Sequence, residues 1–144
     1  MSQAARRPET ISLTVPSHPK YLSVIRRIVE ACARDLRFVD EDTRRLVLAV
    51  DEACSNVIKY AYDGDVTQSI IVEFTCIGDR LTITIRDFGK KPDVEKIAPR
   101  DLADIRPGGL GTHFIRSIMD EVTYDTSPAV GTALTLVKYS SKPE

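Results

Sequence analysis

The sequence contains no tryptophan, and only two histidines and three cysteines occur among its 144 residues. Cys32, Cys54 and Cys76 lie far apart, and they form neither a Cys-x-x-Cys pair nor a cluster with histidine. This spacing argues against a zinc site and favours buried, reduced thiols in a cytoplasmic protein. No apolar run approaches the length of a membrane span, and residues 1–10 lack the apolar core of a secretory signal.

A surplus of charge of one sign is also missing, because the formal net charge is −1. The chain therefore gives no reason to expect a nucleic acid or an anionic membrane as a partner. Hydrophobic residues make up 42% and charged residues 28%, which is typical of a folded domain with a packed core. We expect a flexible N-terminus over residues 1–9, one domain over residues 10–139 and a short tail over residues 140–144.

Alternating apolar residues predict the strands, and apolar residues at the helical period predict the helices. In chain order we expect a strand at 11–15, a helix from 20 to about 36 with Ser17 as its N-cap, a helix capped by Asp40 that runs to about Tyr62, strands at 69–76 and 80–86 joined by a hairpin turn, a polar lid-like connection at 90–107 with a short helix near 94–97, a helix at 112–120, and strands at 121–125 and 132–137. This order predicts an α+β fold, a two-layer sandwich with one mixed, mostly antiparallel sheet and helices on one face.

Two polar residues one turn apart stand out on the second expected helix. Glu52 and Asn56 are at positions i and i+4, and they fall at one flank of the apolar stripe. Asn offers a neutral oxygen to a hard cation such as Mg²⁺, and Glu can accept a proton. The plain alternative is a solvated surface pair.

Two further motifs are weak when taken singly. Asp87 follows a strand and precedes Gly89, where its carboxylate can accept a hydrogen bond from an exocyclic amine or simply cap its own turn. The run Gly108-Gly109-Leu110-Gly111 opens a helix and can bring backbone amides to a phosphate, or it can be a plain loop. No Gly-Lys-Ser/Thr follows these glycines, so the run is not a P-loop.

The order of these motifs resembles a known superfamily. Glu-x-x-x-Asn on a helix, Asp-x-Gly after a strand, Gly-Gly-x-Gly opening a helix and Gly-Thr before the last strand resemble the GHKL ATPase/kinase superfamily, which has the Bergerat ATP-binding fold. The stretches LAVDEACSNVIKYAY, RPGGLGTHFIRSIMDEV and GTALTLVK are most similar to the anti-sigma factor serine/threonine kinases of the RsbW/SpoIIAB branch. The resemblance covers nearly the whole chain, from Ile11 to Val137.

The resemblance implies a role for each matching residue. Glu52 matches the general base that acts on a protein serine or threonine hydroxyl, and Asn56 matches the ligand of Mg²⁺. Asp87 matches the residue that reads the adenine of ATP. The remaining nucleotide-binding set is Lys59, Gly89, Lys91, Gly108, Gly109, Leu110, Gly111, Thr112 and Thr132. Lys59 has a plain alternative as a solvated lysine.

One position departs from the pattern of the family. Its first glycine box usually reads Asp-x-Gly-x-Gly, but Lys91 stands where the second glycine is expected, and Pro92 follows it. This lysine either shifts the loop beneath the nucleotide and weakens binding, or brings a cation to the phosphates.

The resemblance implies a cytoplasmic anti-sigma factor kinase, with ATP and Mg²⁺ as cofactors. Its expected partners are a STAS-type anti-anti-sigma protein as substrate and a sigma factor, and it is expected to form a homodimer. Two alternatives stay open: a non-catalytic binding module governed by nucleotide, and a switch kinase that activates a phosphatase without a sigma partner. A sensor histidine kinase is disfavoured, because neither His18 nor His113 lies in a phosphoacceptor motif.

Overall fold

The computed structural model describes residues 9–92 and 107–140, and for residues 107–112 only the helical backbone is considered. Five strands and three α-helices follow in the order β1 (Glu9–Pro16), α1 (Leu22–Asp35), α2 (Asp40–Asn56), β2 (Ser69–Ile77), β3 (Arg80–Asp87), α3 (Pro107–Ile118), β4 (Glu121–Asp125) and β5 (Thr132–Tyr139). A 3-10 turn, η2 (Pro19–Tyr21), precedes α1, and a π-helical turn, η3 (Val57–Ala61), follows α2. The predicted lid and its short helix fall mainly in residues 93–106, outside the described residues.

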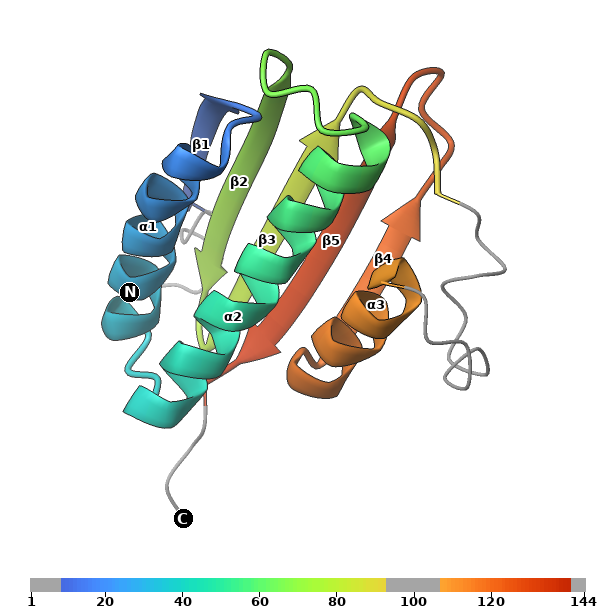
Figure 1. The fold of residues 1–144 in the computed structure, drawn as a ribbon. Helices are drawn as coiled ribbons and strands as arrows, with labels where there is room; N and C mark the ends of the chain where they lie inside the picture. The colour runs from blue at the N-terminus through green and yellow to red at the C-terminus, as the bar shows by residue number, and fades with distance from the viewer. Residues whose placement is uncertain (1–8, 93–106, 141–144) are drawn as a thin grey trace.

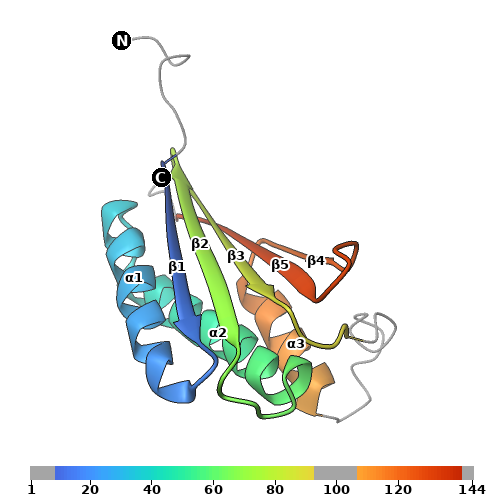
Figure 2. The ribbon, with the colours of Figure 1, turned by 90° about the horizontal axis from the view of Figure 1, so that it is seen from above.

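The strands form a single sheet in the order β1-β2-β3-β5-β4. All three α-helices cover the same face of this sheet, and α2 lies between α1 and α3 (Figures 1 and 2). The predicted two-layer α+β sandwich is therefore confirmed. Every strand pair is antiparallel, so the sheet has no parallel component among the described strands.

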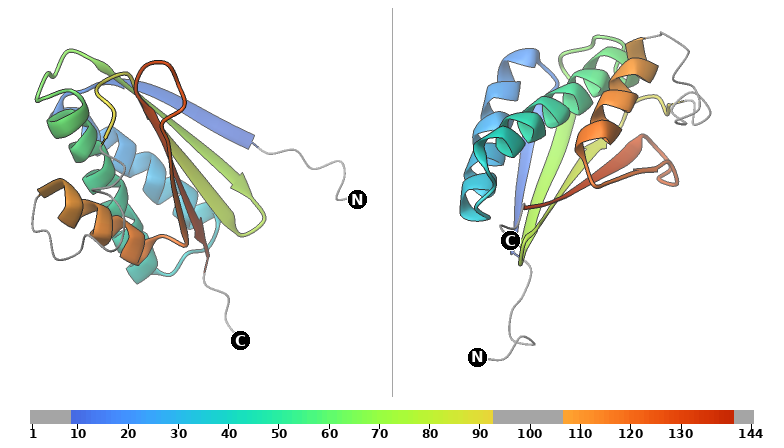
Figure 3. Two further views of the ribbon diagram at one scale, coloured as in Figure 1. Left: turned by 90° about the vertical axis from the view of Figure 1, so that its right-hand side faces the viewer. Right: turned by 90° about the horizontal axis from the view of Figure 1, so that it is seen from below.

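The core lies between the sheet and the helices. Alternate residues of the central strands point to the helices, as in β3, where Leu81, Ile83 and Ile85 are buried. Leu46 and Val50 meet them from α2, where both are at most 1% exposed. The opposite face of the sheet carries mainly threonines and charged residues, and none of the described helices covers it (Figure 3).

Several element boundaries differ from the prediction. Ser17 does not cap a helix, because its hydroxyl donates to Asp65 O at 2.7 Å and accepts from Gln68 N at 3.0 Å. His18 caps η2 instead, with its ring Nδ1 accepting from Lys20 N. Asp40 is the first residue of α2 and not its cap, since Val39 occupies the cap position without a side-chain bond.

One end of the molecule gathers segments that are far apart in the sequence. The C-terminal end of α2, the end of β3 and the loop between β4 and β5 lie together at the top of Figure 1. α3 runs antiparallel to α2 in the same view, so its N-terminus is its upper end. The residues that the sequence singles out are distributed over these segments.

Candidate functional site

The last residue of β3 and the first residue of β5 form a buried polar corner. Asp87 and Thr132 are directly opposite each other in the register, and they are 5% and 4% exposed. The Oδ1 atom of Asp87 accepts the N–H of Gly89 at 2.9 Å. Thr132 Oγ1 is buried and has no hydrogen-bond partner among the described residues. A buried hydroxyl without a partner is unusual in a folded protein and points to a polar ligand.

Burial also sets the protonation behaviour of this corner. Loss of water contact raises the pKa of the Asp87 carboxyl above its ordinary value of 3.8, while the N–H of Gly89, the charge of Arg86, the N–H of Thr132 and the charge of Lys91 lower it. Because burial dominates, the ionised carboxylate is held at a cost in free energy. A donor from a ligand would offset that cost by supplying a hydrogen bond.

Two glycines allow the backbone to close around this corner. A Cβ on Gly131 would lie 2.0 Å from the carbonyl oxygen of Asp87, and a Cβ on Gly89 would lie 2.2 Å from the carbonyl oxygen of Ala61. Gly131 also has a φ of +77°, which favours glycine. Gly89 was predicted from the family pattern as part of the nucleotide-binding set. In the structure its missing side chain leaves room for the carbonyl of Ala61, the last residue of η3.

Tyr62, the residue after η3, joins this turn to the exit of β3. Its hydroxyl donates to Ser69 O at 2.6 Å and accepts from Phe88 N at 2.8 Å. The carbonyl of Ala61 accepts Lys90 N at 2.8 Å. The π-helical turn η3 leads into this junction, and such turns often occur at functional sites. Sequence reasoning missed the role of Tyr62, because its partners are remote in the chain.

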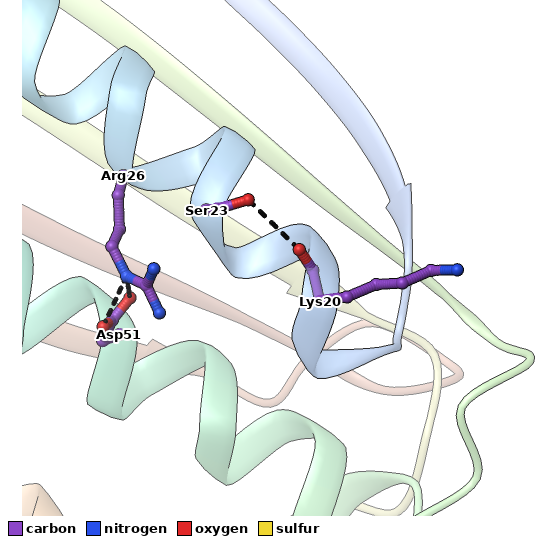
Figure 4. A network of polar contacts seen from close by, with 4 residues as sticks. All are labelled: Lys20, Ser23, Arg26 and Asp51. Carbon is purple, nitrogen blue, oxygen red and sulfur yellow. Dashed lines mark hydrogen bonds and ion pairs between the residues drawn. The ribbon is translucent and has the colours of Figure 1, made fainter.

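Glu52 and Asn56 lie on the flank of α2 that faces away from α1. The opposite flank is marked by Asp51, whose carboxylate forms an ion pair with Arg26 of α1 at 2.8 Å (Figure 4). At about 100° per residue, Glu52 and Asn56 follow Asp51 by roughly 100° and 140°, which turns them to the α3 side. Both are half-buried, as expected for side chains at the edge of a helix interface.

The remaining predicted residues divide into three cases. Lys59 is exposed on the turn that follows α2. The backbone of residues 108–112 belongs to the first turns of α3, which begins at Pro107 and not at Thr112 as predicted. Proline suits the first helical position, and the unpaired amides of a first turn can hold an anion. Lys91 donates from its Nζ to three backbone oxygens, those of Thr126, Pro128 and Gly131.

The arrangement therefore offers a buried acceptor and hydroxyl at one end of the sheet, and a carboxylate and an amide on the facing flank of α2. A helix N-terminus approaches from the third side. Among the described residues no helix has the length and apolar character that a membrane crossing requires. These groups suit a ligand with an amine at one end and phosphates at the other.

Comparisons with known proteins identify the family of this chain. The sequence model of the histidine kinase-like ATPase domain family matches residues 15–138. The serine-protein kinase RsbW of Halalkalibacterium halodurans is 32% identical, with 96% of this chain and 88% of that protein covered. RsbW of Staphylococcus aureus is also 32% identical, over 96% of this chain and 91% of its own length. RsbW of Bacillus subtilis is 29% identical, over 87% of this chain and 83% of its own length.

A solved structure supports the fold. The crystal structure of the RsbU and RsbW domains of a Mycobacterium tuberculosis protein is similar with a TM-score of 0.68 and 18% identity. The match covers 94% of this chain and 33% of that longer chain. Since the family model and the 32% identical relatives span most of the sequence, the chain belongs to the histidine kinase-like ATPase family, in the branch of the RsbW serine-protein kinases.

Proposed function

We propose that this chain is an ATP-dependent serine/threonine protein kinase that acts as a cytoplasmic anti-sigma factor. Its substrate is a STAS-type anti-anti-sigma protein, and its second partner is a sigma factor that it holds inactive. The observation that carries the proposal is the buried corner of Asp87 and Thr132, where the Thr132 hydroxyl has no hydrogen-bond partner in the described part of the chain. The relatives named serine-protein kinase RsbW support the choice of reaction.

The corner fits the adenine end of ATP. The exocyclic amine of adenine is a donor, and the carboxylate of Asp87 is a buried acceptor whose desolvation such a donor would offset. The hydroxyl of Thr132 supplies a second polar contact beside it. Hydrogen bonding of this kind discriminates strongly against bases that lack the amine, because the buried carboxylate would then lose that donor.

The phosphate end lies toward α2 and α3. Asn56 supplies a side-chain oxygen for Mg²⁺, which neutralises phosphate charge when bound. The described residues contain no group of three or more His, Cys, Asp or Glu side chains that could by themselves hold a metal ion. One protein ligand suffices here, because Mg²⁺ bound with a nucleotide takes its other ligands mainly from phosphates and water. The first turn of α3, with residues 108–112, and the side chain of Lys59 are the proposed contacts to the phosphates.

Glu52 is the proposed general base. Its carboxylate lies one helical turn before Asn56 and can accept the proton of an incoming serine or threonine hydroxyl. The oxygen then attacks the terminal phosphoryl group, and ADP leaves. Positioning and charge neutralisation supply most of the rate enhancement in such reactions.

Two partner experiments test the proposal. The tagged chain is incubated with lysate, and any captured STAS protein is then mixed with the chain and γ-labelled ATP. We expect label to move to a serine or threonine of the STAS protein, and we expect a sigma factor among the captured partners. Nucleotide binding without transfer would favour a non-catalytic binding module. Transfer with a STAS protein but no sigma factor would favour the switch kinase that activates a phosphatase. A homodimer is also proposed, and sedimentation of the purified chain measures it.

A further inference from the structure

We propose that Lys91 is a positioning residue for the nucleotide, acting as a latch between the exit of β3 and the β4–β5 loop, residues 126–131. The inference rests on the proposed nucleotide site, and it assigns to this lysine a task other than contact with phosphate. The ammonium group holds the loop in the conformation that sets Thr132 beside Asp87 before any adenine arrives.

The first observation is the geometry of the ammonium group. Lys91 Nζ donates to Thr126 O at 2.7 Å and to Gly131 O at 2.8 Å, and Pro128 O is a third acceptor. A lysine ammonium has three N–H donors, so these carbonyls use its whole donor capacity. A charged donor makes stronger hydrogen bonds than a neutral one. The lysine is therefore occupied by the loop and is not held ready for an anion.

The second observation is that a neighbouring cation binds the same loop. Arg86 donates from Nη1 to Val130 O at 2.9 Å and also to the carbonyl of Asp87, while its guanidinium stacks on the ring of Phe88 at 4.3 Å. Two cations on either side of Asp87 thus hold four carbonyls of one six-residue loop, those of residues 126, 128, 130 and 131. Val130, the large apolar residue of that loop, is 54% exposed, so apolar packing does little to fix it.

The third observation connects the loop to the site. The loop ends at Gly131, whose backbone is pressed against Asp87 and Phe88, and the next residue is Thr132. Displacement of Gly131 would therefore move the hydroxyl of Thr132 relative to the carboxylate of Asp87. A glycine, which the family pattern has at position 91, carries no side chain that could make this tie. In this chain the charged Lys91 side chain holds the β4–β5 loop in place, whereas a glycine at position 91 would leave the loop without this tie.

The affinity for nucleotide depends on the fraction of molecules that have the β4–β5 loop in place. If removal of the ammonium leaves about one tenth of the molecules with the loop in place, the apparent affinity for every ligand of the adenine corner falls about tenfold. The loss is the same for adenosine, ADP and ATP, because the latch acts on the adenine end. A lysine that touched phosphate would instead give a loss that grows with the number of phosphates and spares adenosine.

The test uses Lys91→Met, which keeps the apolar stem and removes the charge. Lys90→Met is the matched control, because its ammonium pairs instead with the exposed carboxylate of Asp63 at 2.9 Å. Affinities for adenosine, ADP and ATP are measured by calorimetry or by competition with a fluorescent ADP. We expect equal losses of about tenfold for Lys91→Met, and changes below about twofold for Lys90→Met, whose exposed ion pair contributes little.

Two further readouts separate the latch from a general loss of structure and from failure of the proposed function. With a STAS substrate, the KM for ATP should rise in Lys91→Met while kcat stays unchanged. Hydrogen exchange of the nucleotide-free protein should be faster at residues 130–132 in Lys91→Met and unchanged in Lys90→Met. Unchanged exchange there, or a loss confined to ADP and ATP, would overturn the latch. If the wild-type chain binds no adenine compound, the proposed function fails, and the exchange experiment still decides whether the latch exists.

Discussion

Asp87 and Thr132 face each other at the end of the β3–β5 pair, and both side chains are buried on the helix-covered side of the sheet. Burial of such polar groups costs free energy unless hydrogen bonds compensate for it. Packing alone does not explain either residue, because Thr132 Oγ1 has no hydrogen-bond partner among the described residues and burial raises the pKa of the Asp87 carboxyl. This corner is the part of the fold that we propose as the adenine-binding site.

Replacing Asp87 by Asn should lower the affinity for ADP without lowering the free energy of unfolding. The amide keeps an oxygen for the N–H of Gly89 but cannot carry a buried charge, so the free energy of unfolding at pH 7 should stay equal or increase. Affinity for ADP should fall by about tenfold to a hundredfold, because a charge-assisted hydrogen bond to adenine is lost. Thermal unfolding and calorimetry measure the two effects. A large drop in stability with unchanged ADP affinity would contradict the role of Asp87.

The difference in stability between the wild type and Asp87→Asn should change with pH in a defined direction. Burial raises the pKa of Asp87 in the folded chain above its ordinary value of 3.8, so the folded state binds a proton that the unfolded state has already lost. Wild-type stability relative to Asp87→Asn should therefore fall as pH rises from that ordinary value through the folded pKa, and then level off. Chemical unfolding across this pH range measures the difference, and a difference of opposite slope would show that hydrogen bonding outweighs burial.

The closeness of the β4–β5 loop to β3 predicts a strong effect of Gly131→Ala. Gly64 is the matched control, since it also has a positive φ, +81°, but nothing lies within 4 Å of an added Cβ. Gly64→Ala should cost about 1 kcal/mol through the left-handed backbone alone. Gly131→Ala should cost about 2 to 3 kcal/mol more, because its Cβ would meet the carbonyl of Asp87 at 2.0 Å. Equal losses in denaturant unfolding would contradict the close approach.

Asn56 should contribute to ADP affinity through Mg²⁺ and not through contact with the adenine base. In Asn56→Ala we expect ADP affinity with Mg²⁺ to fall by about tenfold or more, since even outer partners of a metal site contribute about that much. With EDTA the affinity should match that of the wild type. Ser55→Ala, at the adjacent half-buried position, is the control and should bind normally in both buffers. An equal loss with and without Mg²⁺ would assign Asn56 a different role.

Much of the framework follows from local sequence patterns. Alternation over residues 80–86 places Leu81, Ile83 and Ile85 on the core side, and the strand appears at Arg80–Asp87. The hairpin turn at Gly78, with a φ of +60°, was also predicted and is confirmed. These features depend on residues near one another in the chain, which is why their patterns are visible in it.

The details that complete the corner depend on contacts between remote segments. Ser17 looks like a helix cap by its neighbours, but its partners are Asp65 and Gln68. Lys91 looks like a phosphate ligand by its place after Asp87, but its hydrogen bonds reach a loop some 35 to 40 residues further on. Such choices are decided by tertiary packing, which no local pattern contains.

The role of Glu52 as general base is tested most directly by a comparison of two adjacent carboxylates of α2. Glu52 lies on the flank toward α3, whereas Asp51 lies toward α1 and pairs with Arg26 at 2.8 Å. In Glu52→Gln, transfer of labelled phosphate from ATP to the STAS protein should fall about 10²- to 10⁴-fold while ADP affinity changes little. Asp51→Asn should transfer phosphate at the wild-type rate. Wild-type transfer by Glu52→Gln would contradict the assignment of Glu52 as the base.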